Sequence, residues 1–431
     1  MNAPSEIKLN TGSTQRLVSL DALRGFDMFW IIGADSLVYA LHRLSPNKFT
    51  SFLMYELSHS LWAGLHFYDL IFPLFVFMAG VSLVFSLTKT IQRSGRGQAV
   101  KRIVSRSVLL FLLGIFYYGG LSHSWPDIRL MGVLNRIALA YFFTGLLFCF
   151  FPPRVLAGVC IALLLGYWAL MAYIPVRNIQ LTTSGLVHAA QQRGDAQAVA
   201  ALEAPGNAST IKNSPAWAAA EKLFYATHSY VTGKYRRGLN VCNQFDFQYL
   251  PGWKWYTYWD PEGCLSTIPA IATCLLGVFA GLLLSDTGSS DKRKLIILFV
   301  GGLLLVALGW SWGLEFPVIK KIWTSSYVLV VGGYSALLLG TFYLVVDVWK
   351  FQSWCRPFIW IGMNPLTIYL ADNILGEFTT PAKRFVGGNV KIFLDTHIAP
   401  GLGELLICLT GLLLAFTLAR FLYERKIFIR L

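Results

Sequence analysis

One stretch of the chain decides the fold. It reads His59-Ser60-Leu61-Trp62-Ala63-Gly64-Leu65-His66-Phe67-Tyr68-Asp69 and runs directly into the apolar residues 70–87. From Phe67 onward the run is long enough to cross a bilayer, because about 20 apolar residues at 1.5 Å rise span the hydrocarbon. Two histidines and a carboxylate therefore lie at one end of a predicted membrane helix. Charged groups in a membrane are energetically costly and usually mark a transport pathway or a functional site. The alternative is that His59 belongs to a solvated loop and Asp69 caps the helix.

The composition identifies the class of protein. The chain has 431 residues, a mean hydropathy of +0.55, 55% hydrophobic residues and only 13% charged residues. Soluble domains carry roughly 25% charged residues, so we predict an integral membrane protein. The net charge of +14 would suggest nucleic acid in a soluble protein. Here the basic residues cluster at helix ends, as the positive-inside rule expects, and we predict no nucleic-acid partner.

The apolar segments predict an all-α, polytopic protein with about ten transmembrane helices. They lie at residues 20–41, 67–87, 103–121, 130–151, a fifth ending near 174, 265–284, 295–313, 326–346, 357–372 and 401–422. Residues 175–263 are polar and contain no membrane segment, so we expect one long loop region there. We predict that residues 1–15 form a cytoplasmic tail without a cleaved signal peptide. Residues 16–431 are predicted to form a single transmembrane domain.

Four ionisable residues occupy the first predicted span. Asp21, Arg24 and Asp27 are spaced by three residues, so they share a helix face and can neutralise one another. Asp35 has no such local partner. It lies about 21 Å along the helix from Asp21, in the opposite half of the bilayer.

Charge also predicts the orientation. The basic residues in 89–106, 292–294 and 425–430 fall on the same side as the N-terminus. Ten helices with both chain ends in the cytoplasm satisfy this pattern, in a multi-pass protein of the cell inner membrane. Residues 122–129 and 175–263 then lie outside the cytoplasm, together with His59.

In this orientation four segments, counting the one that carries His59, bring polar groups to one depth. Besides His59, these groups are Asp35, Asp69, Asn135 and Arg136. Convergence of this kind beside a histidine indicates a site. The alternative is an ion-pair network that locks the helices together, with Asp69 paired to Arg136.

Several short motifs follow one another from Arg16 to the C-terminus. They are Arg16-Leu17-x-Ser19-x-Asp21-x-x-Arg24-Gly25, His59-x-x-Trp62-x-Gly64-Leu65, Asp69-Leu70-x-Phe72-Pro73-x-Phe75-Val76-Phe77-x-x-Gly80, Gly132-Val133-Leu134-x-Arg136, Asp260-Pro261-Glu262-Gly263-x-Leu265-x-Thr267-Ile268, Gly362-Met363-Asn364 and Lys426-Ile427-Phe428. Together they resemble the heparan-α-glucosaminide N-acetyltransferase family of polytopic enzymes. The resemblance covers most of the chain except residues 180–240.

The resemblance implies acetyl transfer across a membrane. In this family acetyl-CoA is used from the cytosolic side as a co-substrate, and the acceptor is a terminal glucosamine on the far side. The active-site histidine of the family matches His59. The resemblance also implies a homodimer. One departure is Asp35, where the lysosomal member of the family carries an asparagine, and it puts the identity of the acceptor in doubt.

The chemistry of the reaction assigns roles to these residues. An amine that attacks a thioester needs a base, and a neutral imidazole near pH 7 suits this. His59 is therefore the predicted base, although it could also carry the acetyl group covalently. Asp69 and Asp35 complete the predicted catalytic group, with Asp35 either holding the imidazole of His59 or pairing with Arg136.

The predicted acetyl-CoA-binding residues are Arg24, Asn135, Arg136 and Asn364. Asn364, beside Pro365, either donates to the thioester carbonyl or satisfies a kinked backbone. The basic residues of 89–106 could hold the nucleotide, although topology alone explains them. No metal is predicted, since the seven cysteines show no ligand spacing.

Three further readings stay open. Trp253, Trp255, Tyr256, Tyr258 and Trp259 form either an interfacial belt or a platform for stacking sugars. Cys242 and Cys264 could pair in an oxidising compartment. Two other functions fit the same residues, namely O-acetylation of an envelope polysaccharide and transport through the membrane.

Overall fold

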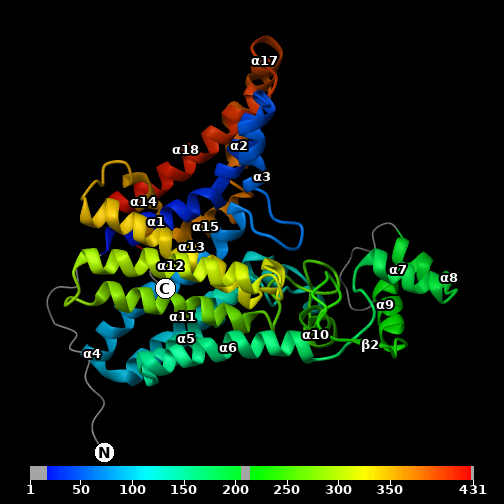
Figure 1. Cartoon of the computed structure of the whole chain (residues 1–431). Coiled ribbons are helices and arrows are strands. Elements are labelled where there is room, and N and C mark those ends of the chain that lie inside the picture. The colour runs from blue at the N-terminus through cyan, green and yellow to red at the C-terminus, as the bar shows by residue number, and fades with distance from the viewer. Residues whose placement is uncertain (1–16, 205–213, 429–431) are drawn as a thin grey trace, which may run out of the picture.

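The computed structural model describes residues 17–204 and 214–428, and these are predominantly helical (Figure 1). The predicted tail 1–15, Arg16 and the last residues 429–431 lie outside the described residues. Seven helices in the described part are long and apolar enough to cross a membrane. The all-α, polytopic class is confirmed.

Six of the seven helices match predicted spans one to one. They are α5 (Val133–Phe150), α6 (Pro153–Tyr173), α11 (Thr267–Ser285), α12 (Asp291–Trp312), α13 (Ser325–Phe342, continued by the π-helical segment Tyr343–Val348) and α18 (Leu402–Glu424). The seventh, α4 (Phe67–Tyr117), covers two predicted spans and breaks at Gly95, where φ is +79°. Helices α4, α5, α6, α11, α12 and α13 lie side by side (Figure 1), and they share one apolar core, against which α12 packs with Trp312.

The first and ninth predicted spans are broken helices. The first consists of α1 (Val18–Phe29), a π-helical turn (Trp30–Ala34) and α2 (Asp35–Leu44), because Gly33 adopts a φ of +122° that ends the regular helix. The ninth divides at Asn364 into α14 (Arg356–Met363) and α15 (Pro365–Leu375), since a residue before proline avoids the helical region. Hydropathy alone shows neither break.

The two broken helices pack closely on each other through their motif glycines. A methyl group on Gly25 would lie 1.7 Å from the carbonyl oxygen of Phe358, and one on Gly362 would lie 1.8 Å from that of Asp21. Neither position therefore tolerates a side chain. This contact explains why both motifs carry glycine and fixes α1 against α14.

Residues 175–263 were predicted as a loop region, but the described part forms a small subdomain. It contains β1 (Val176–Arg177) paired with β2 (Tyr230–Val231), and α7 (Thr183–Gln192), α8 (Ala196–Glu203), α9 (Pro215–Tyr225) and α10 (Val241–Tyr249). Trp217, Phe224, Phe247 and Trp259 are buried in its core. The subdomain lies at one end of the helix bundle (Figure 1).

The remaining elements are short. They are α3 (Lys48–Glu56), α16 (Thr379–Val386), α17 (Asn389–His397) and the 3₁₀ turns Gly120–Ser122, Trp125–Asp127 and Lys320–Ile322. The last of these turns connects α12 to α13. It lies against the residues that precede α4, because the amide of Gly64 donates to the carbonyl of Val318 (2.9 Å).

Candidate functional site

A single large cavity contains much of the predicted site. Its volume is about 1490 Å³, larger than the 300–1,000 Å³ of usual small-molecule pockets. It follows α4 from Asp69 to Arg93, roughly 36 Å at 1.5 Å per residue. We call its two ends the His59 end (His59, Tyr68, Asp69, Arg129, Trp255, Tyr256, Glu262, Lys320 and Lys321) and the basic end (Lys89, Arg93, Lys101, Arg102 and Arg106).

His59 and Asp69 are brought together at the start of α4. The Nδ1 atom of His59 lies 2.8 Å from Oδ1 of Asp69. The other carboxylate oxygen of Asp69 accepts hydrogen bonds from the amides of Ser60 (3.1 Å) and His66 (3.2 Å). Asp69 therefore closes the loop that carries His59, as well as capping the helix. Its side chain is 1% exposed, whereas that of His59 is 51% exposed.

The hydrogen bonds assign a tautomer to His59. A carboxylate only accepts, so Nδ1 carries the proton and Nε2 keeps a lone pair. Burial lowers the pKa of the imidazole, Asp69 opposes this, and the nearby ammonium of Lys320 lowers it further. The net shift is downward from the ordinary value. His59 is therefore neutral near pH 7 and suited to accept a proton.

Lys320 is a third member of this group, and the sequence reading missed it. Its Nζ atom lies 3.2 Å from Nδ1 of His59 and 3.3 Å from Oδ1 of Asp69. A signal was present in the sequence: the predicted topology places Lys320 and Lys321 on the side of the membrane where the positive-inside rule disfavours lysine.

Asp35 does not lie against His59 or Arg136, as the two predicted pairings required. Its carboxylate accepts from the hydroxyl of Tyr68 (3.3 Å) and from the amide of Ser36 (2.7 Å). The ring of Tyr68 in turn lies 5.0 Å from that of His59. Asp35 is therefore connected to the imidazole only through Tyr68.

Arg136 and Asn135 are fully buried, and neither is among the described residues that line the cavity. Arg136 donates to the carbonyl of Pro261 (3.1 Å) and to the hydroxyl of Ser266, and its guanidinium lies over Trp323. The amide of Asn135 donates to the carbonyl of Phe111 (2.9 Å), which joins α5 to α4. These contacts fasten elements together, so the predicted pair of Asp69 with Arg136 does not form.

Asn364 also lies behind the described lining of the cavity. Its side-chain amide donates to the carbonyl of Ile427 (3.0 Å). Two of the motifs, around Asn364 and Ile427, therefore meet where α14 ends and α15 begins. This contact favours the interpretation in which Asn364 satisfies backbone groups at a helix break.

Arg129 and the motif that begins at Asp260 form a buried wall of the His59 end. The guanidinium of Arg129 donates to both carboxylate oxygens of Asp260 (3.0 and 2.8 Å) and to Glu262 (2.7 Å). It also lies 4.2 Å from the ring of Tyr118. Sequence reading did not single out Arg129, because its partners lie more than 130 residues further along the chain.

Four of the five aromatic residues of 253–259 divide into two groups. Tyr258 and Trp259 are buried in the core of the subdomain. Trp255 and Tyr256 instead line the cavity, and Trp255 is 54% exposed. Only this second group is placed where a sugar ring could stack.

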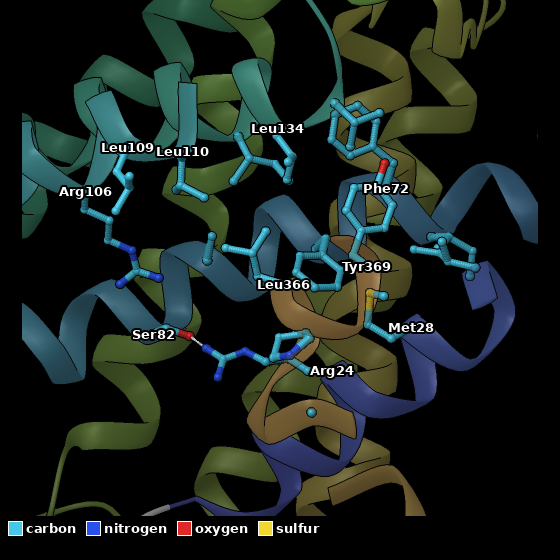
Figure 2. Close-up of a pocket in the computed structure, with 18 of the residues that line it drawn as sticks. Arg24, Met28, Phe72, Ser82, Arg106, Leu109, Leu110, Leu134, Leu366 and Tyr369 are labelled. Carbon is cyan, nitrogen blue, oxygen red and sulfur yellow. Dashed lines mark hydrogen bonds between the residues drawn. The ribbon is translucent and has the colours of Figure 1, made fainter. Parts of the chain in front are cut away.

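Arg24 lies between the two ends of the cavity. Its guanidinium donates to the hydroxyl of Ser82 (Figure 2). It also lies 3.5 Å from the carboxylate of Asp21. Apolar side chains, including Met28, Phe72, Leu134 and Leu366, line the cavity around it (Figure 2). Beyond Arg24, the basic end of the cavity contains five basic side chains, which come from the two halves of α4 on either side of Gly95.

Cys242, in α10 of the subdomain, and Cys264, just after the subdomain, are free thiols in the structure. The sulfur of Cys242 is buried and lies 2.9 Å from the hydroxyl of Tyr167. The open possibility of a disulfide between Cys242 and Cys264 is therefore not realised here.

The fold and the cavity together define a polytopic helical membrane protein with a His–Asp–Lys group at one end of a long internal site and a cationic cluster at the other. Residues 16–195 match the family described as heparan-alpha-glucosaminide N-acetyltransferase, catalytic. The chain is 27% identical over 403 residues to the mouse protein named heparan-alpha-glucosaminide N-acetyltransferase. This matched region covers 88% of this chain and 56% of the mouse protein. The chain is 28% identical over 387 residues to the human protein of that name, covering 84% and 53%. The chain is therefore similar to the heparan-α-glucosaminide N-acetyltransferase family over these residues, and it spans about half the length of the two relatives.

Proposed function

We propose that this protein is a membrane acyltransferase that moves an acetyl group from acetyl-CoA to the amine of a terminal, glucosamine-like amino sugar. The observation that carries the proposal is the cavity, which connects a cationic cluster with the His59–Asp69 pair. The names of the two relatives supply the transferred acetyl group and the glucosaminide acceptor class, and the cationic cluster supports coenzyme A as the carrier.

The basic end is the proposed site for the phosphates of coenzyme A. Lys89, Arg93, Lys101, Arg102 and Arg106 all line the cavity there, and cations bind phosphate by charge-assisted hydrogen bonds. The apolar middle suits the pantetheine arm, which would carry the thioester past Arg24 toward His59. The phosphates themselves would stay at the basic end, because they cannot cross hydrocarbon.

At the His59 end the chemistry is acyl transfer by general base catalysis. The amine attacks the thioester carbonyl, the new C–N bond forms and the C–S bond breaks. Nε2 of His59 takes the proton that the amine loses and passes it to the departing thiolate. Asp69 holds the imidazole in the tautomer that leaves Nε2 free. Trp255 and Tyr256 are the proposed platform for the sugar ring.

The proposal includes an orientation. Coenzyme A enters from the cytoplasm, where the basic end lies, and the subdomain with the His59 end faces the other side of an inner membrane. Both chain ends are then cytoplasmic. We also propose a homodimer, in keeping with the family.

Transport is the second candidate function, and one observation favours it. Two broken helices pack on each other beside the cavity, and discontinuous helices build the ion and substrate sites of many transporters. An enzyme must cleave the thioester, whereas a transporter need not.

The test uses purified protein with acetyl-CoA and glucosamine. The enzyme proposal predicts that free coenzyme A and N-acetylglucosamine appear in equal amounts. N-Acetylglucosamine offered as acceptor should give no turnover, which separates transfer to nitrogen from transfer to oxygen. Absence of thioester cleavage with any amino sugar would favour transport.

A further inference from the structure

We propose that Lys320 is a positioning residue that keeps His59 neutral by sharing one carboxylate oxygen of Asp69 with the imidazole. This inference rests on the proposed function and adds a group to the site that neither the motifs nor the family match assigns. Its basis is geometric. The Nζ atom of Lys320 lies 3.3 Å from Oδ1 of Asp69, the same oxygen that accepts from His59 at 2.8 Å.

The position of Lys320 is fixed by the loop that carries His59. The 3₁₀ turn Lys320–Ile322 is fastened to this loop by the bond from the Gly64 amide to Val318 (2.9 Å) and by the bond from Nζ of Lys321 to the carbonyl of Leu61 (2.6 Å). Gly64 has a φ of +111°, which suits glycine alone. The two segments therefore form one unit, and the lysine cannot move away from the imidazole without breaking several contacts.

The charges around His59 determine its state. Asp69 of α4 faces the imidazole with one negative charge, while Lys320 and Lys321 of the 3₁₀ turn face it with two positive charges. Tyr68 of α4, the other titratable group in contact, is neutral over the working pH range. A second cation next to Nδ1 opposes a charge on the ring, because like charges at about 3–4 Å repel strongly in a partly buried site.

If Lys320 served only to stabilise the fold by pairing with Asp69, its ammonium would not need to lie beside the imidazole of His59. Asp69 already accepts from two backbone amides and from His59. The ammonium of Lys320 instead lies 3.2 Å from the imidazole nitrogen itself. As a consequence, the carboxylate orients the ring without raising its basicity to the level of an ordinary His–Asp pair, and the lone pair on Nε2 stays available.

The alternative is that Lys320 reacts directly, with its side-chain amine accepting the proton of the substrate amine or the acetyl group. Burial lowers the pKa of this lysine, and Asp69 opposes the shift. Arginine distinguishes the two roles, since it keeps the positive charge and is never a base in proteins. An electrostatic role survives Lys320→Arg, whereas a role as base or nucleophile does not.

The experiment measures the titration of His59 in the full-length, purified protein. Diethyl pyrocarbonate reacts with a neutral imidazole but not with imidazolium, and mass spectrometry that assigns the modification to His59 gives its rate at each pH. The variants are Lys320→Met, which removes the charge at similar size, Lys320→Arg, and Lys321→Met, which removes the second positive charge for comparison. Size-exclusion chromatography selects folded samples.

We expect Lys320→Met to move the midpoint of this titration upward by about one pH unit. Lys320→Arg should stay within a few tenths of the wild-type midpoint, and Lys321→Met should move it by less than half as much as Lys320→Met. The pH dependence of kcat/KM for acetyl transfer should shift in the same direction, with about a tenfold loss on the acidic side. KM for acetyl-CoA should change little.

An unchanged midpoint in Lys320→Met would overturn the proposal. So would a Lys320→Arg variant that has the wild-type midpoint but no transfer activity, because the lysine would then act as a chemical group. The titration does not depend on turnover. If the wild-type protein transfers no acetyl group, the proposed function fails, while the midpoint of His59 still decides the role of Lys320.

Discussion

The imidazole of His59 donates from Nδ1 to Oδ1 of Asp69 over 2.8 Å, and the other oxygen of the same carboxylate closes the intervening loop by accepting from Ser60 and His66. One side chain therefore sets the tautomer of His59, holds the loop and caps the start of α4. The spacing of the motif from His59 to Asp69 follows from this geometry.

Asp69→Asn tests the orienting role of the carboxylate. The variant keeps the shape but leaves His59 without an anionic partner, so we expect transfer to fall by on the order of 10²–10⁴. A carboxylate favours imidazolium, and its loss should lower the pKa of His59 further. The acidic limb of the pH–rate profile should therefore move downward. A profile that moves upward, or turnover close to that of the wild type, would remove Asp69 from the mechanism.

Asp35 should act through Tyr68. Asp35→Asn keeps an acceptor for the Tyr68 hydroxyl, so we expect less than a threefold change in kcat and no shift of the pH–rate profile. Asp35→Ala removes the acceptor and should resemble Tyr68→Phe in kcat. If Asp35→Asn alone shifts the acidic limb, the carboxylate acts directly on the charge of His59 and the account of this residue is wrong.

The basic end should determine the affinity for coenzyme A. The double variant Arg93→Gln, Arg102→Gln removes two cations from the cavity, and we expect Kd for coenzyme A to rise at least tenfold with a weaker salt dependence. Arg154→Gln is the control, because this exposed arginine lies outside the described lining of the cavity. Equal effects from the two variants would mean that general surface charge, rather than the cavity, attracts the nucleotide.

Asp246 should make the stability of the subdomain depend on pH. Burial raises the pKa of this carboxyl group to about 7, although the amides of Cys264 (3.1 Å) and Asp260 (3.4 Å) donate to it. The unfolded chain releases this proton near pH 4, so the free energy of unfolding falls as pH rises from about 4 to about 7. We expect a lower Tm at pH 8 than at pH 5, and a smaller difference in Asp246→Asn. The same difference in wild type and variant would assign the pH dependence to other groups.

Much of this architecture could be predicted from the sequence, because the membrane leaves a strong signal. Eight of the predicted spans are regular helices, since long apolar runs allow little else. The breaks at Gly33 and Asn364 were not predictable in the same way. A single glycine or an Asn-Pro pair barely changes hydropathy, whereas each break depends on the local backbone, namely the positive φ of Gly33 and the proline after Asn364.

The site was predictable where its parts are close in sequence. His59 and Asp69 are ten residues apart, and the motif shows both. Lys320 lies 261 residues from His59, and Arg129 lies 131 residues from Asp260, so no local spacing connects them. Arg136, Asn135 and Asn364 were chosen because buried polar groups mark sites. The structure places them against backbone carbonyls instead, since a helix bundle also needs polar groups to hold irregular segments.

The most direct test of the central claim is acetyl transfer by His59→Ala in proteoliposomes, measured with labelled acetyl-CoA and glucosamine beside the affinity for coenzyme A. The account predicts that transfer falls by about 10²–10⁴, while Kd for coenzyme A stays within twofold, because the basic end lies roughly 36 Å away along α4. A His59→Ala protein that transfers acetyl groups at close to the wild-type rate would contradict the account.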